Sequence, residues 1–415
     1  MTVAINPTDR SHLVAVSTGR GAPGGPRSTN FAYVSPDGGA TWTTVPAANP
    51  ERRLQGDDTI AFSADGTAHH VYISFDGIRT ARPDRAMSGI FARRSRDGLA
   101  WSDPVPVVDH VNSVEPFEDK PWPAVDTAAD SPHRGSLYVA WTRFDVYGSA
   151  DPAHESHILF ARSRDGGRTF SAPVRVSDRP GDARDGDDTV EGAVPAVGPK
   201  GEVYLVWAGP RGLELDRSRD GGHTFGEDRV IARTPGGWDL PVPGVKRHNG
   251  LPVTATDLSP GKDRGSIYVT WIDERNRDLD VFVLASRDGG ETWEEPVRVN
   301  DDPAGNGAAQ LFAWTAVDPG DGSVNVVFYD RRGLSGTLTG LTLARSVDGG
   351  RTFVNHRIAQ EPFPCRDEAF LGDYIGVAAA GGQVVAAWAH VLDDGETALS
   401  AALFRFRPGT QQAER

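Results

Sequence analysis

Ser163-Arg-Asp165-Gly-Gly167-Arg-Thr169-Phe170 is the stretch that decides the fold, because it recurs along the chain with little change. Five stretches have this full length, and a sixth, from Ser95 to Trp101, is one residue shorter. Their first residues are Ser35, Ser95, Ser163, Ser218, Ser286 and Ser346, in steps of 55 to 68 residues. Self-similarity at such a period predicts a repeat architecture, in which small units pack into one body.

The residue types of the repeated stretch are those of a turn. An aspartate accepts hydrogen bonds from the backbone two residues on, and a Gly-Gly pair supplies positive φ angles. The final Trp or Phe is expected to fill apolar space between neighbouring sheets. We therefore interpret these aspartates as structural rather than catalytic.

Each turn is preceded by three short apolar or alternating runs and followed by a fourth, which is the pattern of a four-stranded unit. One of these runs often ends in Trp, as in Leu137–Trp141 and Val203–Trp207. The prediction is an all-β, single-domain β-propeller of seven blades, with six blades and an irregular end as the alternative. The last unit lacks a clear fourth strand. The units run over about 1-50, 54-110, 118-180, 188-235, 247-300, 308-360 and 370-410.

Charge and composition restrict the partners. The 415 residues carry 57 acidic and 43 basic side chains, a formal net charge of -14. This excess argues against nucleic acid or an anionic membrane as the main partner. No stretch is long and apolar enough for a membrane span, and the single cysteine, Cys365, rules out an intrachain disulfide and a Cys-based metal site. The N-terminus has no basic and apolar leader, so no secretory signal is expected, and we expect a monomer.

The repeated Ser-x-Asp-x-Gly-x-Thr-Trp pattern resembles the Asp box, or BNR repeat, of the sialidase superfamily. The resemblance covers essentially the whole chain and is closest to bacterial sialidase-like proteins, which also tend to carry stretches such as Lys120–Asp126, Phe328–Arg332 and Gly372–Gly376. It implies a propeller, a carbohydrate ligand that is anionic, and a secreted or periplasmic setting. Asp boxes also occur in lyases, sorting receptors and assembly factors, so the fold is implied more sharply than the activity.

The resemblance also implies a set of site residues on the face opposite the turns. In sialidases a tyrosine nucleophile is activated by a glutamate, an aspartate serves as acid/base and three arginines clamp the substrate carboxylate. By position Tyr374 is the tyrosine candidate and Glu191 its partner. Asp58, Asp119 and Asp84 compete for the acid/base role. The expected substrate-binding residues are Arg143, Arg275, Arg331, Asp330, Asp373 and His248.

This sequence departs from the sialidase pattern at two points. The Arg-Ile-Pro motif has no counterpart, and Val190-Glu-Gly192 replaces Asn-Glu-Ser. Three functions therefore stay open: an exo-acting glycosidase on sialic acid or a related acidic sugar, a non-catalytic propeller that binds glycans or protein, and a polysaccharide lyase using His248 or Tyr374. No cofactor or metal site is predicted, apart from a Ca²⁺ alternative at the acidic loop that contains Asp182, Asp185, Asp187 and Asp188.

Overall fold

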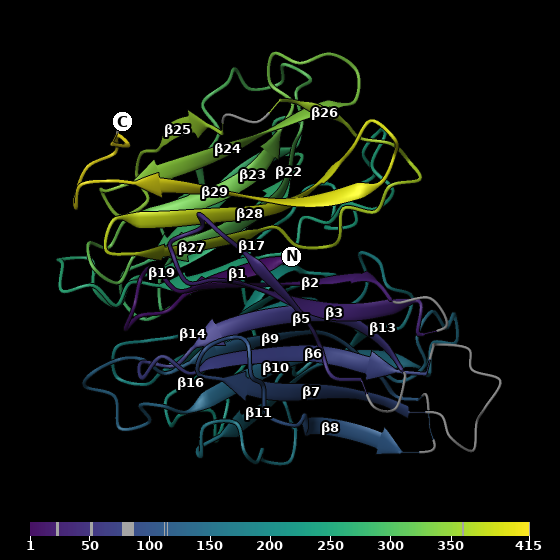
Figure 1. Cartoon of the computed structure of the whole chain (residues 1–415). Coiled ribbons are helices and arrows are strands. Elements are labelled where there is room, and N and C mark those ends of the chain that lie inside the picture. Colours follow the sequence, from purple (N-terminus) through teal and green to yellow (C-terminus); the bar gives the residue numbers. More distant parts are fainter. Residues whose placement is uncertain are drawn as a thin grey trace. The chain divides into compact units, whose positions relative to one another are not determined.

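The computed structural model describes residues 1–21, 25–49, 53–76, 87–111, 113, 115–358 and 361–414, and in these ranges it contains strands and turns but no helix. Within this described part, no helix suits a membrane span. The predicted loop residue Asp84 lies outside the described residues. Seven sheets follow one another along the chain, which confirms the seven-bladed β-propeller and excludes the six-bladed alternative (Figure 1).

The chain packs as two compact units, and the N-terminal unit, Val3–Val230, holds four blades. In each blade the first three or four strands are antiparallel neighbours in chain order, as expected for short strands joined by turns, while the short β13 and β26 pair with β11 and β24. Blade 1 consists of β1 (Thr2–Ile5), β2 (Leu13–Arg20), β3 (Ser28–Ser35) and β4 (Thr43–Pro46). Blade 2 consists of β5 (Leu54–Phe62), β6 (Ala68–Phe75), β7 (Met87–Ser95) and β8 (Val105–Val111). Blade 3 consists of β9 (Phe117–Val125), β10 (Leu137–Phe144), β11 (Glu155–Ser163), β12 (Val174–Arg175) and β13 (Gly181–Asp182). Blade 4 consists of β14 (Glu191–Val197), β15 (Val203–Gly209), β16 (Gly212–Ser218) and β17 (Arg229–Ala232).

The C-terminal unit, Ile231–Arg415 with Met1–Thr2, holds three blades. The last blade has three strands, which confirms the prediction that this unit lacks a clear fourth strand. Blade 5 consists of β18 (Val253–Thr256), β19 (Ile267–Asp273), β20 (Asp280–Ser286) and β21 (Val297–Arg298). Blade 6 consists of β22 (Gln310–Val317), β23 (Val324–Asp330), β24 (Leu338–Ser346), β25 (Val354–Arg357) and β26 (Phe363–Pro364). Blade 7 consists of β27 (Gly376–Ala380), β28 (Gln383–Val391) and β29 (Thr397–Arg405).

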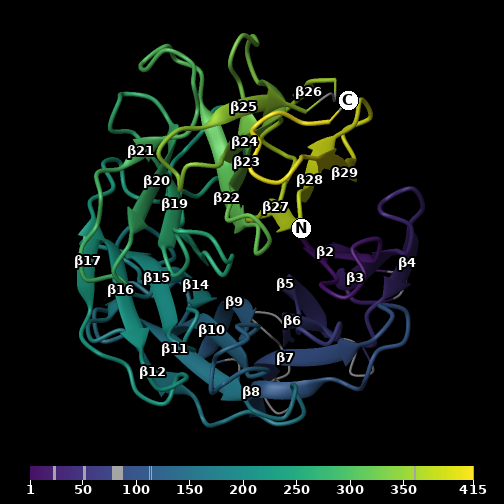
Figure 2. The same cartoon turned by 90° about the vertical axis from the view of Figure 1, so that its left-hand side faces the viewer.

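The core lies between successive blades, because the central strands are apolar on both faces. In β10, for example, Leu137 to Trp141 are fully buried, and Val139 and Trp141 pack with Val71 and Ile90 of the preceding blade. Figure 2 shows these blades, β5–β8 and β9–β12, following each other within the N-terminal unit. The tryptophans of the second strands are all buried, as the apolar runs predict, and each lies two or three residues before the end of its strand: Trp141, Trp207, Trp271 and Trp388.

The repeated turns, which we call box turns, are closed by their own side chains. In the turn Ser163–Phe170, Asp165 accepts from the backbone N–H groups of Arg168 and Thr169 (2.9 and 3.0 Å) and from the Thr169 hydroxyl (2.7 Å), and Ser163 Oγ accepts from Gly167 N (2.8 Å). The aspartate thus reaches three and four residues on, rather than the two that we expected. Phe170 packs between blades 2 and 3, as predicted.

The inner strands carry a second recurring feature, a bulge near their first residues. Pairing with the next strand shifts register at this point in β5, β9, β14 and β22. The first residue of each bulge has a positive φ: Asp57 (46°), Lys120 (48°), Gly192 (76°) and Phe312 (50°). A bulge re-aims the neighbouring side chains, so Asp119 and Glu191, which precede it, occupy equivalent positions in adjacent blades.

Candidate functional site

Two of the predicted acidic residues, Asp119 and Glu191, meet at one buried lysine in the N-terminal unit. Lys120 Nζ donates to Glu191 Oε1 and to Asp119 Oδ2 (3.4 Å), and lies 3.9 Å from Asp185 Oδ1. The lysine side chain is 2% exposed and the Glu191 side chain is 0% exposed. We call Asp119, Lys120, Tyr147, Asp185 and Glu191 the Lys120 cluster.

The other side of the Lys120 cluster is a tyrosine–carboxylate pair. The Tyr147 hydroxyl donates to Asp185 Oδ2, and the two loops that carry these residues are joined by a bond from Gly148 N to Ala183 O (2.6 Å). The Tyr147 ring is held edge-on by Phe117 and Phe144, with centroids 5.2 and 5.0 Å away. Tyr147 and Asp185 are partly exposed, so this pair forms the accessible rim of a buried charge cluster.

The electrostatics of the Lys120 cluster favour a protonated Glu191 carboxyl. Burial raises the pKa of the Glu191 carboxyl to about 8, against the opposing effect of Lys120, and the nearby Asp185 and Asp119 raise it further. Burial, Asp119 and the bond to Asp185 also raise the pKa of Tyr147, so its phenol is neutral. Three carboxylates share one ammonium, and a neutral Glu191 lowers the resulting negative charge. A buried acid whose pKa lies near neutrality is suited to donating a proton.

Asp58 lies apart from the Lys120 cluster, in blade 2. Its carboxylate accepts from the Thr18 hydroxyl (3.0 Å) and lies 3.8 Å from His70 Nε2. Asp58 is the second residue of the bulge in β5, whereas Asp119 precedes the bulge in β9. The two described aspartates among the three acid/base candidates are therefore not equivalent in the structure.

Two of the three predicted clamp arginines are neutralised by the protein itself. Arg143 donates to the buried Glu118 through Nε (2.8 Å) and Nη2 (2.5 Å). Arg275 donates to Asp273 through Nε and Nη2 (2.6 Å to Oδ2) and lies over the Phe282 ring at 4.3 Å. The Arg275 pair is bidentate, whereas both donors of Arg143 meet one oxygen of Glu118, and such charge-assisted bonds hold the side chains in place.

Arg331 differs from both and is not equivalent to Arg275 by position. In the stretch Asp330–Arg332 it is Arg332 that pairs with Asp330, at 2.5 Å from Oδ2, as Arg275 pairs with Asp273. Arg331 is 8% exposed and donates to Thr339 Oγ1 (3.1 Å) and Pro243 O (3.0 Å). The buried Nη2 atom of Arg331 has no hydrogen-bond partner among the described residues. The Arg331 side chain lines a hollow of about 520 Å³ together with Glu274, Arg277 and Asp278.

The remaining predicted residues of the C-terminal unit are held by close structural contacts. His248 is 2% exposed, with one ring nitrogen facing Leu240 O (3.3 Å) and the other accepting from Phe312 N (3.2 Å), and burial lowers its pKa to about 3. Asp373 accepts two bonds from Arg247 (2.8 and 2.7 Å). The Tyr374 ring packs edge-on against Trp314, with centroids 5.7 Å apart.

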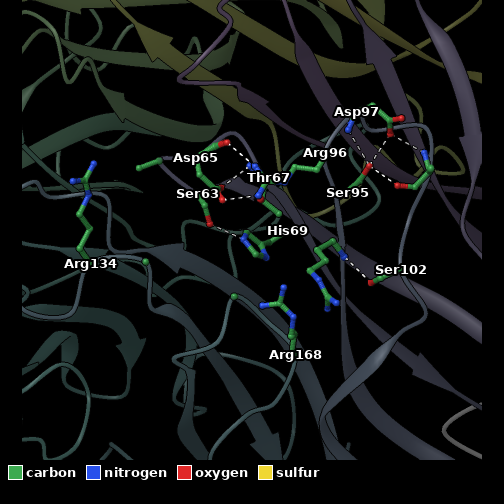
Figure 3. A pocket seen from close by; sticks show the side chains of 15 residues that line it. Ser63, Asp65, Thr67, His69, Ser95, Arg96, Asp97, Ser102, Arg134 and Arg168 are labelled. Atoms are coloured by element: carbon green, nitrogen blue, oxygen red, sulfur yellow. Dashed lines mark hydrogen bonds and ion pairs between the residues drawn. The ribbon is translucent and has the colours of Figure 1, made fainter.

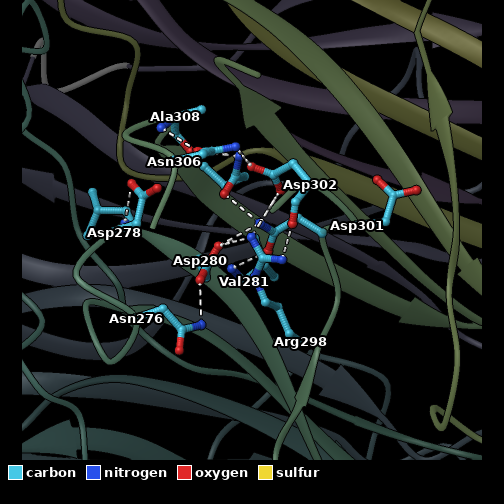
Figure 4. Close-up of polar contacts among 12 residues, drawn as sticks. Asn276, Asp278, Asp280, Val281, Arg298, Asp301, Asp302, Asn306 and Ala308 are labelled. Carbon is cyan, nitrogen blue, oxygen red and sulfur yellow. Dashed lines mark hydrogen bonds and ion pairs between the residues drawn. The ribbon is translucent and has the colours of Figure 1, made fainter. Parts of the chain in front are cut away.

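Oxygen-rich clusters occur in both units. The acidic loop of the Ca²⁺ alternative is divided in the structure: Asp185 belongs to the Lys120 cluster, while Asp182 lies 3.7 Å from Arg184. In the described ranges, one set of ligand atoms lies within 4.8 Å of one another, from Asp145, Glu155 and His157. In blade 5, Figure 4 shows Arg298 beside Asp280 and Asp302, at 2.7 and 3.1 Å. Since the cation there is a guanidinium, this cluster is neutralised by the chain itself.

Sequence reasoning did not single out Lys120, Tyr147 and Asp185 as a group. Two signals pointed toward them: the loop 142–157 is longer than a turn needs, and Lys120 is one of only four lysines. Their convergence depends on bulges and loop contacts between blades 3 and 4, which have no signature in one dimension.

Comparison with known proteins identifies the fold. No protein-family model matches the chain, and no curated protein matches it by sequence. Several solved structures match the chain in fold. An ulvan lyase, described as a polysaccharide lyase, is 13% identical with a TM-score of 0.55 over 98% of this chain and 93% of that one. A Hadza microbial sialidase is 14% identical with a TM-score of 0.54 over 90% and 73%. A Dyadobacter fermentans protein of unknown function is 12% identical with a TM-score of 0.53 over 85% and 95%.

Proposed function

We propose that the protein is a glycosidase that acts on an acidic sugar, with the Lys120 cluster as its acid–base centre. The observation that carries this proposal is the hydrogen bond from Tyr147 to Asp185 beside the buried Glu191–Lys120 pair. A phenol, a carboxylate that can take its proton and a second carboxyl that holds a proton are the three groups that a retaining cleavage with a tyrosine nucleophile needs. The fold likeness to sialidases and a lyase is compatible with this chemistry and does not select it.

The proposed reaction has two steps. Tyr147 Oη attacks the anomeric carbon while its proton passes to Asp185. The glycosidic C–O bond breaks, and the leaving oxygen takes the proton of Glu191. Water then attacks the same carbon and gives its proton to Glu191, the bond to Tyr147 breaks, and Asp185 returns the proton to the phenol. Lys120 stays charged throughout and holds Glu191 and Asp119 in position.

An acidic substrate is supported by the nature of the proposed nucleophile. A neutral phenol approaches a centre next to a carboxylate without like-charge repulsion, as an aspartate nucleophile would not.

The test is a substrate panel of aryl sialosides, aryl uronides and neutral aryl glycosides. Wild-type protein is expected to cleave an acidic member, and Tyr147→Phe to abolish turnover while ligand affinity stays within a few-fold, because the hydroxyl acts mainly in the transition state. Cleavage of neutral glycosides alone would refute the acidic-sugar assignment.

One observation favours a second candidate, a non-catalytic glycan-binding propeller. Arg143 is paired with Glu118 and Arg275 with Asp273, so neither of these predicted clamp arginines has a free guanidinium. The predicted binding residue Asp373 is likewise paired, with Arg247. Binding of a glycan without turnover of any member of the panel would favour this candidate. Release of an unsaturated uronide instead of a hydrated sugar would favour a lyase.

A further inference from the structure

The shortened box turn, Ser95–Trp101, is the one of the six copies that departs from the full-length pattern. It differs from the full-length turns by one residue, and Ala100 occupies the place that Thr169 has in blade 3. Asp97 consequently accepts from the backbone N–H groups of Leu99 (2.9 Å) and Ala100 (2.8 Å), with no threonine hydroxyl to bind its second oxygen. The turn is therefore smaller than the box turn beside it.

A hollow of about 620 Å³ lies next to this turn, between blades 2 and 3 of the N-terminal unit. Ala100 and Ser102 line one side of it, and the box turn of blade 3 lines another through Gly166 and Arg168. Its volume is within the range of small-molecule sites, roughly 300–1,000 Å³. The hollow lies at the end of blade 3 opposite to the Lys120 cluster, since β9 runs from Phe117 beside the cluster to Val125 at the turn.

Four arginines face this hollow: Arg94, Arg96, Arg134 and Arg168. Figure 3 shows Arg168 near His69, with Arg134 and Ser102 on opposite sides of the pocket. Arg96 is paired with Asp65 at 2.9 Å. Within the described residues, none of the other three arginines forms an ion pair with a carboxylate. In the described part of the chain, the one acceptor of the Arg168 guanidinium is the backbone carbonyl of Asp165 (2.5 Å).

The hollow is positively charged, whereas the whole chain carries a net negative charge. Two acidic side chains, Asp65 and Asp97, accompany the four arginines, which leaves an excess of two positive charges in a chain with a net charge of -14. His69 adds none at neutral pH, because burial lowers its pKa to about 4. Its Nε2 is tied to the Ser63 hydroxyl at 2.7 Å, which makes it a fixed part of the wall.

We propose that this hollow binds an acidic oligosaccharide, through sulfate or carboxylate groups on successive sugars. Three guanidiniums without carboxylate partners repel one another unless anions lie between them, and planar guanidiniums bind both oxyanions bidentately. The arginines come from three separate elements, β7, the β9–β10 turn and the box turn of blade 3, so they are spread around the hollow. Such spacing suits several anionic groups along one ligand better than a single ion.

The experiment is titration calorimetry at low and high salt with three probes: a chondroitin sulfate tetrasaccharide, an oligogalacturonate and inorganic sulfate. The double variant Arg94→Gln/Arg134→Gln is expected to bind the sulfated or the carboxylated oligosaccharide at least about tenfold more weakly than wild type, as for the loss of charge-assisted contacts. Arg219→Gln is the matched control, because Arg219 occupies the position of Arg96 in the blade 4 box turn. It should bind as wild type does.

A second variant tests the role of the short turn. Inserting a glycine after Gly98 together with Ala100→Thr restores a full-length box turn and should close the hollow, with the same loss of binding. Glu191→Gln should leave binding to the hollow unchanged, which separates this site from the proposed acid–base centre. Equal affinity in wild type and the double variant, no binding of either oligosaccharide, or binding of inorganic sulfate as tight as that of the oligosaccharides would overturn the proposal.

Discussion

At the scale of single residues, Glu191 shows how burial and partners compete. The carboxyl is fully buried, and burial raises its pKa more than Lys120 lowers it. A buried charge is costly unless it is paired, so Glu191 is either ionised and paired with Lys120 or protonated and neutral. Both are compatible with the local geometry, because Lys120 has two further carboxylates, Asp119 and Asp185, within 3.9 Å.

This balance predicts a pH dependence of stability. The pKa of Glu191 is raised in the folded state to about 8 from the ordinary glutamate value of 4.5. The folded state therefore holds its proton more tightly, and this stabilisation is complete below pH 4.5 and is lost as the pH rises through about 8. Melting temperatures measured from pH 5 to 9 should fall more steeply in wild type than in Glu191→Gln. Parallel curves for the two proteins would contradict the shift.

At the scale of elements, the box turns and the bulges have different consequences. The box turn repeats because its hydrogen bonds are local, so each copy closes independently of the rest of the chain. The bulges repeat less regularly, with Asp, Lys, Gly and Phe at the positive-φ position. They decide which side chains of neighbouring blades meet, as Asp119 and Glu191 do at Lys120.

The box turns are therefore expected to affect stability and leave the chemistry unchanged. Asp165→Ala removes four hydrogen bonds from an exposed turn and should lower the free energy of unfolding by about 1 kcal/mol. Activity per folded molecule should stay at the wild-type level. Chemical denaturation and a rate normalised to folded protein measure the two quantities. A large loss of activity with an unchanged denaturation midpoint would oppose a structural role.

At the scale of the whole molecule, the apolar contacts join successive blades within each unit. In the C-terminal unit one continuous cluster includes Ile272 of blade 5, Leu343 of blade 6 and Trp388 of blade 7. In the N-terminal unit, separate clusters join blades 1 and 2, 2 and 3, and 3 and 4. Because one hydrophobic core is shared by blades 5, 6 and 7, a cavity in its middle should lower the stability of all three blades.

Leu343→Ala tests this coupling. Leu343 is fully buried, and truncating a buried leucine costs about 2–5 kcal/mol. Hydrogen exchange should become faster throughout blades 5 to 7. A matched change in a box turn, Asp348→Ala, should affect exchange mainly in its own turn. Faster exchange confined to blade 6 in Leu343→Ala would argue against a shared core.

The fold was predictable from the sequence to a greater extent than the site. Six copies of one turn and the apolar runs around them predicted seven blades, the last without a clear fourth strand, because these signals are local and repeated. The distribution of charges was not predictable in the same way. Whether Arg331 or Arg332 pairs with Asp330 depends on one residue of register, and the meeting of Tyr147 with Asp185 depends on two loops of different strands.

The central claim is that Tyr147 and Asp185 act as nucleophile and base on an acidic sugar. It is tested most directly by trapping the covalent intermediate with fluorinated sialosyl and uronyl fluorides, followed by peptide mass spectrometry. The account predicts a glycosyl label on the peptide that contains Tyr147, and no label in Tyr147→Phe. A label on Tyr374, or substrate turnover that persists in Tyr147→Phe, would contradict it.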